Sequence, residues 1–283
     1  MSYVLILGVK YDPVLQYFYQ QPFIRKDKRF IFINEERIGK DIFLSHLGWE
    51  LPCGSFLPHS HVSAVYNRLY LSGHNHIAQS YLQWLLDEVY PKVLNRPKHT
   101  LSNFSKPWQL LKAKAIGLKI PPTTIEANRV VSQGQVGPDR QDVRIYKSVS
   151  SVRSIVKSVS TNTQNQVHEP VLFQKDMGRV NIRVHMLRDR TSIIAQEIES
   201  QAVDYRYDIH ASKAKVFQLP GSIIKKLESL ACEFGLVLSG SDFMSHKGSL
   251  YFLEMNPSPG YAYYEKQVKG TPLSQKIYEY LIS

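Results

Sequence analysis

The chain has 283 residues, of which 43% are hydrophobic and 21% are charged, and no segment approaches the roughly 20 consecutive apolar residues of a membrane helix. This composition is typical of a globular chain with one large domain or a few small ones. Lys and Arg outnumber Asp and Glu by 35 to 24, and the net charge of +11 favours anionic partners such as nucleotides or an acidic peptide.

Residues 1–98 are predicted to form an α/β domain. VLIL at 4–7 and FIFIN at 30–34 are continuous apolar runs of the length typical of buried strands. The first run has no basic segment before it and no small-residue cleavage site after it, so a signal peptide is not expected. SYLQWLLDEVYPKVL at 80–94 follows a helical pattern.

A second unit, residues 99–172, is predicted to begin with a helix. Ser105 can cap its N-terminus, Pro107 is tolerated in the first turn, and Gly117 is suited to end it. Short strands are expected at 120–125 and 143–147, followed by a Ser-rich stretch.

The third unit, residues 173–283, is predicted to pair its strands in antiparallel fashion. A hairpin is expected from 181–189 and 191–200, with Asp189 and Arg190 at the turn, and a second from 236–244 and 250–256 around SHKGS. Between them, a helix capped by Ser222 and ended by Gly235 carries one apolar stripe, made of Ile223, Ile224, Leu227, Leu230, Ala231 and Phe234. A last helix is expected from Thr271-Pro272 to Leu281.

Polar side chains in the second hairpin form a candidate metal site. Residues two apart on a strand share a face, so Glu254 and Asn256 should point together while Leu253 and Met255 point into the core. A Glu-x-Asn pair alone is more often a solvated outer face.

The position of Asp242 depends on the turn of this hairpin. An odd-numbered turn centred on Lys247 would place Asp242 opposite Phe252 and on the same face as Glu254 and Asn256. Two carboxylates and an amide carbonyl are the hard oxygen ligands that Mg²⁺ selects.

Basic residues elsewhere in the chain could bind phosphate. Lys106 lies at a predicted helix start and Lys147 at a predicted strand end, and each can place an ammonium on a phosphate. Arg183 and Arg206 lie on or beside strands in the same half of the chain. Each lysine taken alone is more often a surface residue.

Several blocks together resemble the ATP-grasp superfamily, in particular its RimK-type carboxylate-amine ligases. The blocks are LSNFSKPWQLLKAKAIGLKIPPTTI, VRIYK, PVLFQKDMGRVNIRVHMLRD, VDYR, and SDFM followed by FLEMNPSPGYAYYE, in the family's order from Leu101 to Ser283. The resemblance implies an ATP-grasp fold of α/β and α+β class, in which two α+β subdomains (99–172 and 173–283) clasp ATP. Residues 1–98 would be the preceding α/β domain, which usually helps to select substrates.

The resemblance also implies roles for individual residues. The ATP phosphates would be bound by Lys106 and Lys147, and the adenine linker would be formed by Gln174, Lys175 and Met177. The transferred phosphoryl group would be held by Arg183 and Arg206. The metal would be bound by Asp242, Glu254 and Asn256, and the loop Pro257–Gly260 would close that end of the site. The linker would contact adenine through its backbone rather than through the Lys175 side chain.

The chain also departs from the family pattern. The loop SVSSVRS at 148–154 lacks the usual glycines, and Arg153 is a candidate to replace their phosphate contacts. Lys175 stands where an acidic residue is common, and YDIHASKAK at 207–215 also lacks glycines. Nucleotide preference and phosphate geometry are therefore open.

The expected activity is an ATP- and Mg²⁺-dependent ligase that forms an amide through an acyl-phosphate, with two metal ions and with Mn²⁺ as an alternative. Its substrates would be a carboxylate and an amine from an amino acid, peptide or protein terminus, possibly acidic, and one variant would cross-link a single peptide. No base for the amine is identified, since His185 and His210 are more often structural histidines.

Rival functions are an ATP-binding protein without turnover and a polyanion binder. Nucleic acid is not favoured as a partner, because no helix-turn-helix, zinc-finger or RNP-like pattern is present. Cys53 and Cys232 form neither a disulfide framework nor a metal motif, which favours a cytoplasmic setting. No membrane partner is expected, and homo-oligomerisation is open.

Overall fold

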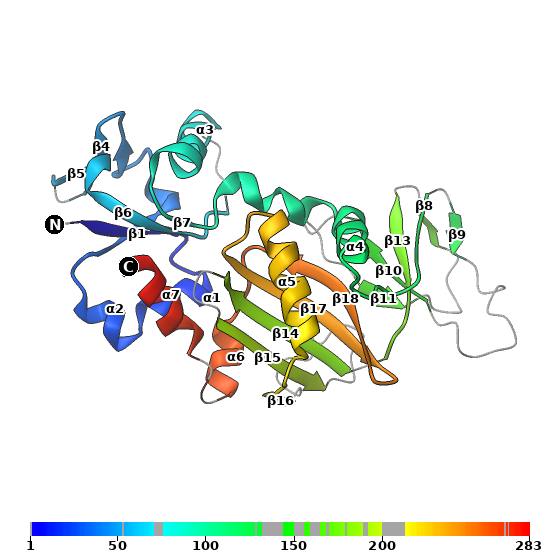
Figure 1. Cartoon of the computed structure of the whole chain (residues 1–283). Coiled ribbons are helices and arrows are strands. Elements are labelled where there is room, and N and C mark those ends of the chain that lie inside the picture. The colour runs from blue at the N-terminus through cyan, green and yellow to red at the C-terminus, as the bar shows by residue number, and fades with distance from the viewer. Residues whose placement is uncertain are drawn as a thin grey trace, which may run out of the picture.

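The structure is a computed structural model, and it describes residues 2–52, 54–70, 76–127, 129–131, 144–149, 156–158, 165–167, 170–178, 180–188, 192–199, 213–268, 270 and 272–283. Arg153, Arg206 and the expected turn at Asp189 and Arg190 lie outside the described residues. In the part of the chain that is described, no helix is long and apolar enough to cross a bilayer. Figure 1 shows three groups of elements side by side: an N-terminal α/β unit, a central sheet and a smaller β-rich unit beyond it.

The N-terminal unit is built on a four-stranded parallel sheet. Its strands are β1 (Tyr3–Gly8), β2 (Phe30–Asn34), β6 (Val62–Asn67) and β7 (Val93–Leu94), in the order β2-β1-β6-β7. Beside it, β3 (Phe43–Leu44), β4 (Gly48–Glu50) and β5 (Phe56–Pro58) form a small antiparallel sheet. The strands predicted at 4–7 and 30–34 are confirmed, and the first is buried because alternate residues face two different apolar clusters.

The helix predicted over 80–94 is wrong in its second part. The helices of this unit are α1 (Pro13–Tyr19), α2 (Pro22–Lys26), α3 (His76–Trp84) and a π-helical turn at Leu85–Val89, with 3-10 turns at Glu35–Arg37, His59–His61 and Pro97–Phe104. Tyr90 then takes an extended backbone, with φ −71° and ψ 131°, as the residue before a proline prefers. Since Pro91 also has no N–H to donate, the helix ends there and the next residues form β7.

The middle of the chain forms the smaller β-rich unit and its entry helix. Helix α4 (Lys106–Ala115) is followed by β8 (Thr123–Glu126), β9 (Arg129–Val131), β10 (Arg144–Ser148), β11 (Val156–Ser158), β12 (Asn165–Val167) and β13 (Val171–Lys175), which give sheets in the orders β11-β10-β13-β8 and β12-β9. The predicted signals of α4 are confirmed: the Ser105 hydroxyl accepts a hydrogen bond from the Trp108 N–H, and Gly117 has a φ of +80°.

The central sheet is antiparallel and five-stranded. Its strands are β14 (Val180–Leu187), β15 (Ser192–Glu199), β16 (Lys213–Val216), β17 (Leu238–His246) and β18 (Ser249–Asn256), in the order β16-β15-β14-β17-β18. Both predicted hairpins are confirmed. Helix α5 (Gly221–Glu233) lies across one face of the sheet (Figure 1) and buries its predicted stripe at Leu227, Leu230 and Ala231.

The predicted cap of α5 is wrong. Ser222 lies inside the helix, and Pro220 occupies the N-cap position, where its carbonyl accepts hydrogen bonds from the N–H groups of Ile223 and Ile224. Proline satisfies this position because an N-cap residue needs an extended backbone and a free carbonyl, and it contributes no N–H that would need a partner.

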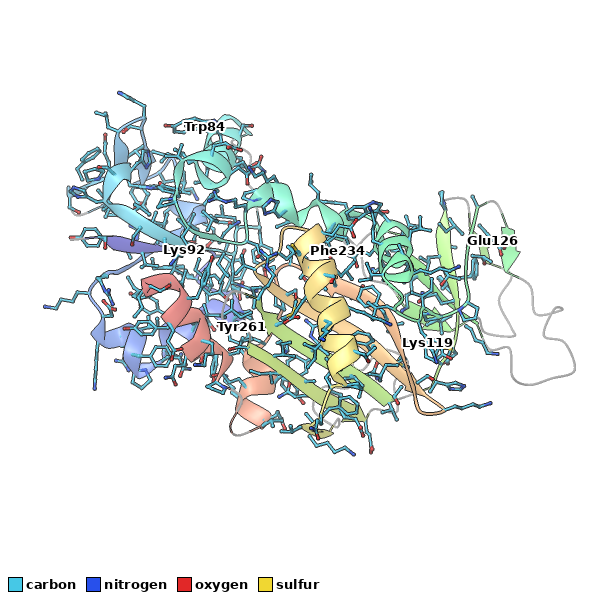
Figure 2. The ribbon with its side chains drawn as sticks, in the orientation of Figure 1. Trp84, Lys92, Lys119, Glu126, Phe234 and Tyr261 are labelled. Atoms are coloured by element: carbon cyan, nitrogen blue, oxygen red, sulfur yellow. The ribbon has the colours of Figure 1, made fainter. Side chains whose placement is uncertain are left out.

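An apolar cluster joins the N-terminal unit to the central sheet. Helices α6 (Ala262–Gln267) and α7 (Leu273–Ile282) close the chain, and α7 confirms the predicted last helix. The cluster combines side chains of β1, α1 and β6 with Leu187, Leu238 and the buried face of α7. Tyr261, which Figure 2 shows between these parts, is 1% exposed. The N-terminal unit therefore packs on the sheet that carries the candidate site.

Gln109 ties α4 to the last strand of the central sheet. Its Nε2 donates to the carbonyls of Ser102 and Met255 at 2.9 Å, and its Oε1 accepts from the Met255 N–H at 2.9 Å. Gln109 is 1% exposed, so water does not reach this position to replace its hydrogen bonds to the backbone groups.

We expect Gln109→Leu to lower the free energy of unfolding by about 1 to 3 kcal/mol for each backbone group that is left unpaired. Gln275→Leu is the matched control, because Gln275 is exposed on α7 and its side chain donates to Glu279 on the surface of the same helix. This variant should change the free energy of unfolding by less than about 0.5 kcal/mol. Urea unfolding of both variants measures the difference. Equal stability of the two variants would contradict the role of Gln109.

Candidate functional site

The β17–β18 hairpin turns at Lys247 and Gly248, whose φ angles are 47° and 74°. His246 pairs with Ser249, so the turn has two residues, and the predicted odd-numbered turn with Asp242 opposite Phe252 is wrong. The register instead shifts once, at a bulge: Phe243 pairs with Phe252, and Asp242 pairs with Glu254. The two carboxylates therefore lie directly opposite each other.

This bulge decides which side chains of β18 face the core. Phe252 and Met255 are both 0% exposed and pack in the cluster beneath α5. Leu253, which was expected in the core, is only partly buried because it is the extra residue of the bulge. Glu254 and Asn256 then face away from α5, together with Asp242.

Arg183 lies on β14 directly opposite Asp242. Its Nη1 donates to Asp242 Oδ2 at 2.8 Å, and Arg183 is 6% exposed. The guanidinium crosses over Gly240, where a Cβ atom would lie 2.5 Å from Arg183 Nη2 and 2.5 Å from the Pro259 side chain. Only glycine fits between the arginine and the loop.

His185 supports Arg183 from the next position on the same face. Its Nε2 accepts from Arg183 Nε at 3.3 Å, and the ring makes a hydrogen bond to the Gly260 backbone. Burial, and secondly the nearby charge of Arg183, hold the pKa of His185 well below its ordinary value. The imidazole is therefore neutral at pH 7 and accepts rather than repels the guanidinium.

Lys106 approaches the same face from α4. It is the first residue of the helix, is 5% exposed, and its Nζ lies 3.5 Å from Glu254 Oε2. Its backbone N–H donates to the Val149 carbonyl at 2.9 Å, which brings the end of β10 to the start of α4. Lys147, two residues before Val149, pairs with Leu172 and Val156 in the smaller sheet and is partly buried.

The predicted linker connects the two sheets. Gln174 is 2% exposed and its Nε2 donates to the Thr123 hydroxyl at 3.1 Å, so its side chain bonds within the smaller unit. The Lys175 N–H donates to the Pro122 carbonyl at 3.0 Å. The Met177 carbonyl accepts from His246 Nδ1 at 2.9 Å, and this bond joins the linker to the end of β17.

The structure thus brings together Lys106, Arg183, Asp242, Glu254 and Asn256 on one face of the central sheet, and it places Lys147 and the linker in the adjoining unit. Arg153, Arg206 and His210 lie outside the described residues. Sequence reasoning missed Gln109 and Gly240. A glycine inside a strand often marks a close approach, so Gly240 carried a readable signal.

The oxygen atoms of this face suit a hard divalent cation. Asp242 and Glu254 each have one oxygen near a cation of the chain, and Asn256 Oδ1 accepts from the Ser258 N–H at 2.8 Å. No group of three or more His, Cys, Asp or Glu side chains among the described residues could hold a metal. Two carboxylates and one amide, completed by water and phosphate oxygens, fit Mg²⁺ better than a softer ion.

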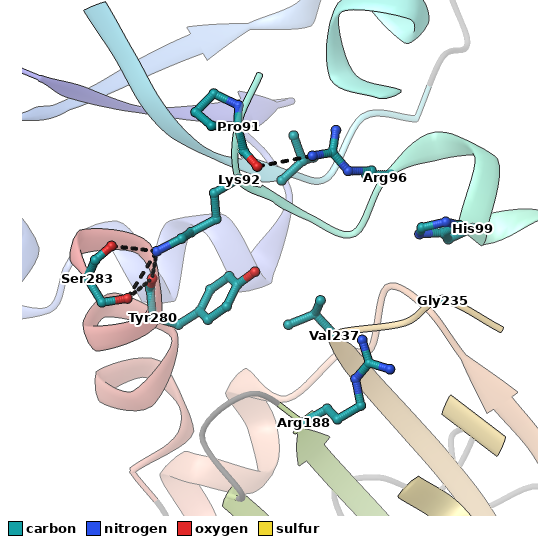
Figure 3. A pocket seen from close by; sticks show the side chains of 10 residues that line it. Pro91, Lys92, Arg96, His99, Arg188, Gly235, Val237, Tyr280 and Ser283 are labelled. Atoms are coloured by element: carbon teal, nitrogen blue, oxygen red, sulfur yellow. Dashed lines mark hydrogen bonds between the residues drawn. The ribbon is translucent and has the colours of Figure 1, made fainter. Parts of the chain in front are cut away.

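A cavity of about 420 Å³ lies away from this face, among the segments 91–99, 188, 235–237 and the end of α7 (Figure 3). Two of its basic side chains donate hydrogen bonds to backbone carbonyls at the C-terminal ends of helical segments. Lys92 donates to the carbonyls of Tyr280 and Ser283, and Arg96 donates to four carbonyls between Leu86 and Pro91. None of the predicted site residues that the structure describes lines this cavity.

Known structures share this architecture across the whole chain. A RiPP-associated ATP-grasp ligase of Chryseobacterium gregarium, in complex with ADP and a leader and core peptide, matches with a TM-score of 0.79 and 19% identity over 100% of this chain and 97% of its own. The macrocyclase MdnC of Microcystis aeruginosa MRC, bound with precursor peptide MdnA, gives 0.78 and 20% over 100% and 99%. D-alanyl-alanine synthetase A of Vibrio cholerae gives 0.61 and 15% over 99% and 97%.

No family model and no curated protein matches the chain in sequence. The three structural matches, each at 20% identity or less, establish the fold: the chain has the ATP-grasp fold, as the order of its sequence blocks predicted. The finer RimK-type assignment stays a prediction.

The neutral His185 should make stability depend on pH. In the unfolded chain the pKa of a histidine is about 6.5. Below that pH the unfolded state therefore binds a proton that the folded state, with its lower His185 pKa, does not bind. Stability should therefore fall as the pH drops below about 6.5, by up to about 1.4 kcal/mol per pH unit, until the lower folded pKa is reached. His185→Gln should lose this contribution, and urea unfolding at several pH values between 7.5 and 5 measures it. Parallel curves for the two proteins would refute a buried neutral His185.

Proposed function

We propose that the chain is an ATP- and Mg²⁺-dependent carboxylate-amine ligase that forms an amide bond through an acyl-phosphate. The observation that carries the proposal is the pairing of Lys106 with Glu254 and of Arg183 with Asp242 on one face of the central sheet, with Asn256 beside them, inside an ATP-grasp fold. Phosphate-binding cations and metal ligands in direct contact suit phosphoryl transfer, which depends on positioning and charge neutralisation.

Each residue of the candidate site would have a separate role in the reaction. Lys106 and Lys147 would hold phosphate oxygens of ATP, and Asp242, Glu254 and Asn256 would hold the metal, which supplies positive charge to the triphosphate. The substrate carboxylate displaces ADP from the γ-phosphorus and becomes an acyl-phosphate, while Arg183 stabilises the charge on the transferred group. The amine then attacks the acyl carbon, and phosphate leaves as the amide forms and the amine loses its proton.

Further assignments belong to the same proposal. Arg206 would assist Arg183, Arg153 would cover the phosphates, and the linker of Gln174, Lys175 and Met177 would contact adenine. The family resemblance also implies two Mg²⁺ ions, or Mn²⁺ in their place. It further implies that the chain is divided into the units 1–98, 99–172 and 173–283.

A peptide is the favoured substrate. The matches with TM-scores of 0.79 and 0.78 are an ATP-grasp ligase in complex with a leader and core peptide and a macrocyclase bound with a precursor peptide, whereas D-alanyl-alanine synthetase A gives 0.61. We therefore favour an acidic peptide that supplies the carboxylate, and the cross-linking variant, in which one peptide supplies both groups. An ATP-binding protein without turnover is not favoured.

Hydroxylamine trapping tests the reaction class without knowledge of the amine. Candidate peptides and amino acids incubated with ATP, Mg²⁺ and hydroxylamine should give a hydroxamate and ADP only when the correct carboxylate is present, because hydroxylamine intercepts an acyl-phosphate. Formation of AMP and pyrophosphate would replace the mechanism by adenylation. No product across a broad set of acidic peptides would favour the protein without turnover.

Glu254→Gln tests the metal assignment. The change removes one charge at nearly constant shape, so it should abolish Mg²⁺-dependent ADP formation and leave the fold intact. Glu233→Gln is the matched control, because Glu233 forms an ion pair with Lys112 on the surface, outside the site, and this variant should retain activity. Full activity of Glu254→Gln would remove Glu254 from the metal site.

A further inference from the structure

The loop Pro257–Gly260, which directly follows Asn256, is held by side chains from distant parts of the chain. The Pro257 carbonyl accepts from Asn95 Nδ2 at 2.5 Å, and the Pro259 carbonyl accepts from Arg68 Nη1 at 3.2 Å. The Gly260 backbone bonds to His185. Since the two prolines have no N–H groups, the carbonyls are the groups through which the loop can be anchored at these positions.

Arg68 is fixed before it reaches the loop. Its Nε donates to Asp12 Oδ2 at 2.8 Å, and the exposed fractions of the two side chains are 7% and 0%. The other oxygen of Asp12 accepts from the N–H groups of Val14 and Leu15 at the start of α1. The guanidinium is thus held beside a carboxylate whose two oxygens are both bonded, while its Nη1 donates to the Pro259 carbonyl.

Among the described residues, the Asn95 side chain makes four hydrogen bonds, all to the C-terminal unit. Nδ2 donates to the carbonyls of Leu238 and Pro257, and Oδ1 accepts from the N–H groups of Val237 and Leu238. One side chain, 4% exposed, thus joins the start of β17 to the residue that follows β18. The two strands that carry Asp242, Glu254 and Asn256 are linked at this end through the N-terminal unit.

The loop also contacts the site directly. Asn256 Oδ1 accepts from the Ser258 N–H, and Pro259 lies against Gly240 beside Arg183 Nη2. A shift of the loop would therefore move both a proposed metal ligand and the space that Arg183 occupies.

We infer that Arg68 and Asn95 are positioning residues, which hold the Pro257–Gly260 loop so that Asn256 and Arg183 keep the orientation that the metal site requires. The inference rests on the proposed function, and it gives the N-terminal unit a task beyond substrate selection. Neither residue touches the reacting atoms, so both act through the loop. Partners that orient metal ligands in this way typically contribute at least tenfold to metal affinity.

Arg68→Lys is the sharpest variant. A lysine ammonium can keep the charge pair with Asp12, which would otherwise be a buried unpaired carboxylate, but it is a single compact group and cannot span Asp12 and the Pro259 carbonyl together. Arg96→Lys is the matched control: Arg96 also donates to backbone carbonyls, but all of them lie within the N-terminal unit. Asn95→Asp, which keeps the acceptor Oδ1 and removes the Nδ2 donor to the carbonyls of Leu238 and Pro257, is the second test variant.

Two measurements on the full-length proteins test the inference. Amide hydrogen exchange without nucleotide should be faster over residues 256–265 in Arg68→Lys and Asn95→Asp than in the wild type and in Arg96→Lys. Calorimetric titration of ADP at a series of Mg²⁺ concentrations should show that both test variants need about tenfold more Mg²⁺ for half-maximal nucleotide affinity. Nucleotide affinity without Mg²⁺ should be unchanged, and a loss of global stability alone would not move this Mg²⁺ midpoint.

The outcomes separate the inference from the proposed function. If the nucleotide affinity of the wild-type protein did not change with Mg²⁺ concentration, the proposed function would be refuted. A wild type with the expected Mg²⁺ dependence, together with Arg68→Lys and Asn95→Asp variants of unchanged Mg²⁺ midpoint, would refute the inference alone. An Arg96→Lys variant that shifts the midpoint as far as the test variants do would likewise refute the inference and leave the proposed function intact.

Discussion

A bulge of one residue in β18 determines which side chains of the last hairpin reach the candidate site. Side chains alternate between the faces of a strand, so one extra residue reverses the alternation beyond it. Phe252 and Met255 can both be buried beneath α5 only because the bulge lies between them. Without it, burial of Phe252 would turn Glu254 into the same apolar core, where an unpaired charge is costly. Packing of the core therefore fixes the face on which the carboxylates stand.

The charges on that face are arranged in pairs. Lys106 and Arg183 are nearly buried, and each lies beside a carboxylate of the hairpin. A buried charge requires a partner, and the chain supplies each cation with one of the residues proposed to bind metal. Binding of phosphate and Mg²⁺ would exchange these partners, with the cations turning to phosphate oxygens and the carboxylates to the metal. Such an exchange leaves no charge unpaired at either stage.

Sequence reasoning predicted the features that have local signals. The apolar runs gave β1 and β2, and Ser105 with Gly117 gave α4. The end of the π-helical turn before Pro91 also had a local signal, since a proline restricts the residue before it, but the predicted helix ran past it to residue 94. The bulge was not, because it depends on which of several apolar residues the core accepts. Contacts between remote segments had no local signal at all: Asn95 and Pro257 are 162 residues apart and Arg68 and Pro259 are 191 apart, and no spacing rule connects them. The order of the family blocks predicted the fold, but it covered only the chain after residue 100.

Contacts between remote segments, which the sequence does not show, also change how the net charge should be interpreted. The sequence suggested that a charge of +11 would attract acidic substrates, but several of the basic side chains bond to backbone carbonyls rather than line the candidate site. Lys92 and Arg96 donate to carbonyls where helical segments end, and Lys226 donates to the Gly117 carbonyl just after α4. These cations satisfy backbone acceptors that helix ends leave without partners. An acidic substrate therefore does not follow from the charge of the whole chain, and the two cations paired with carboxylates at the site, Lys106 and Arg183, are already assigned to phosphate oxygens.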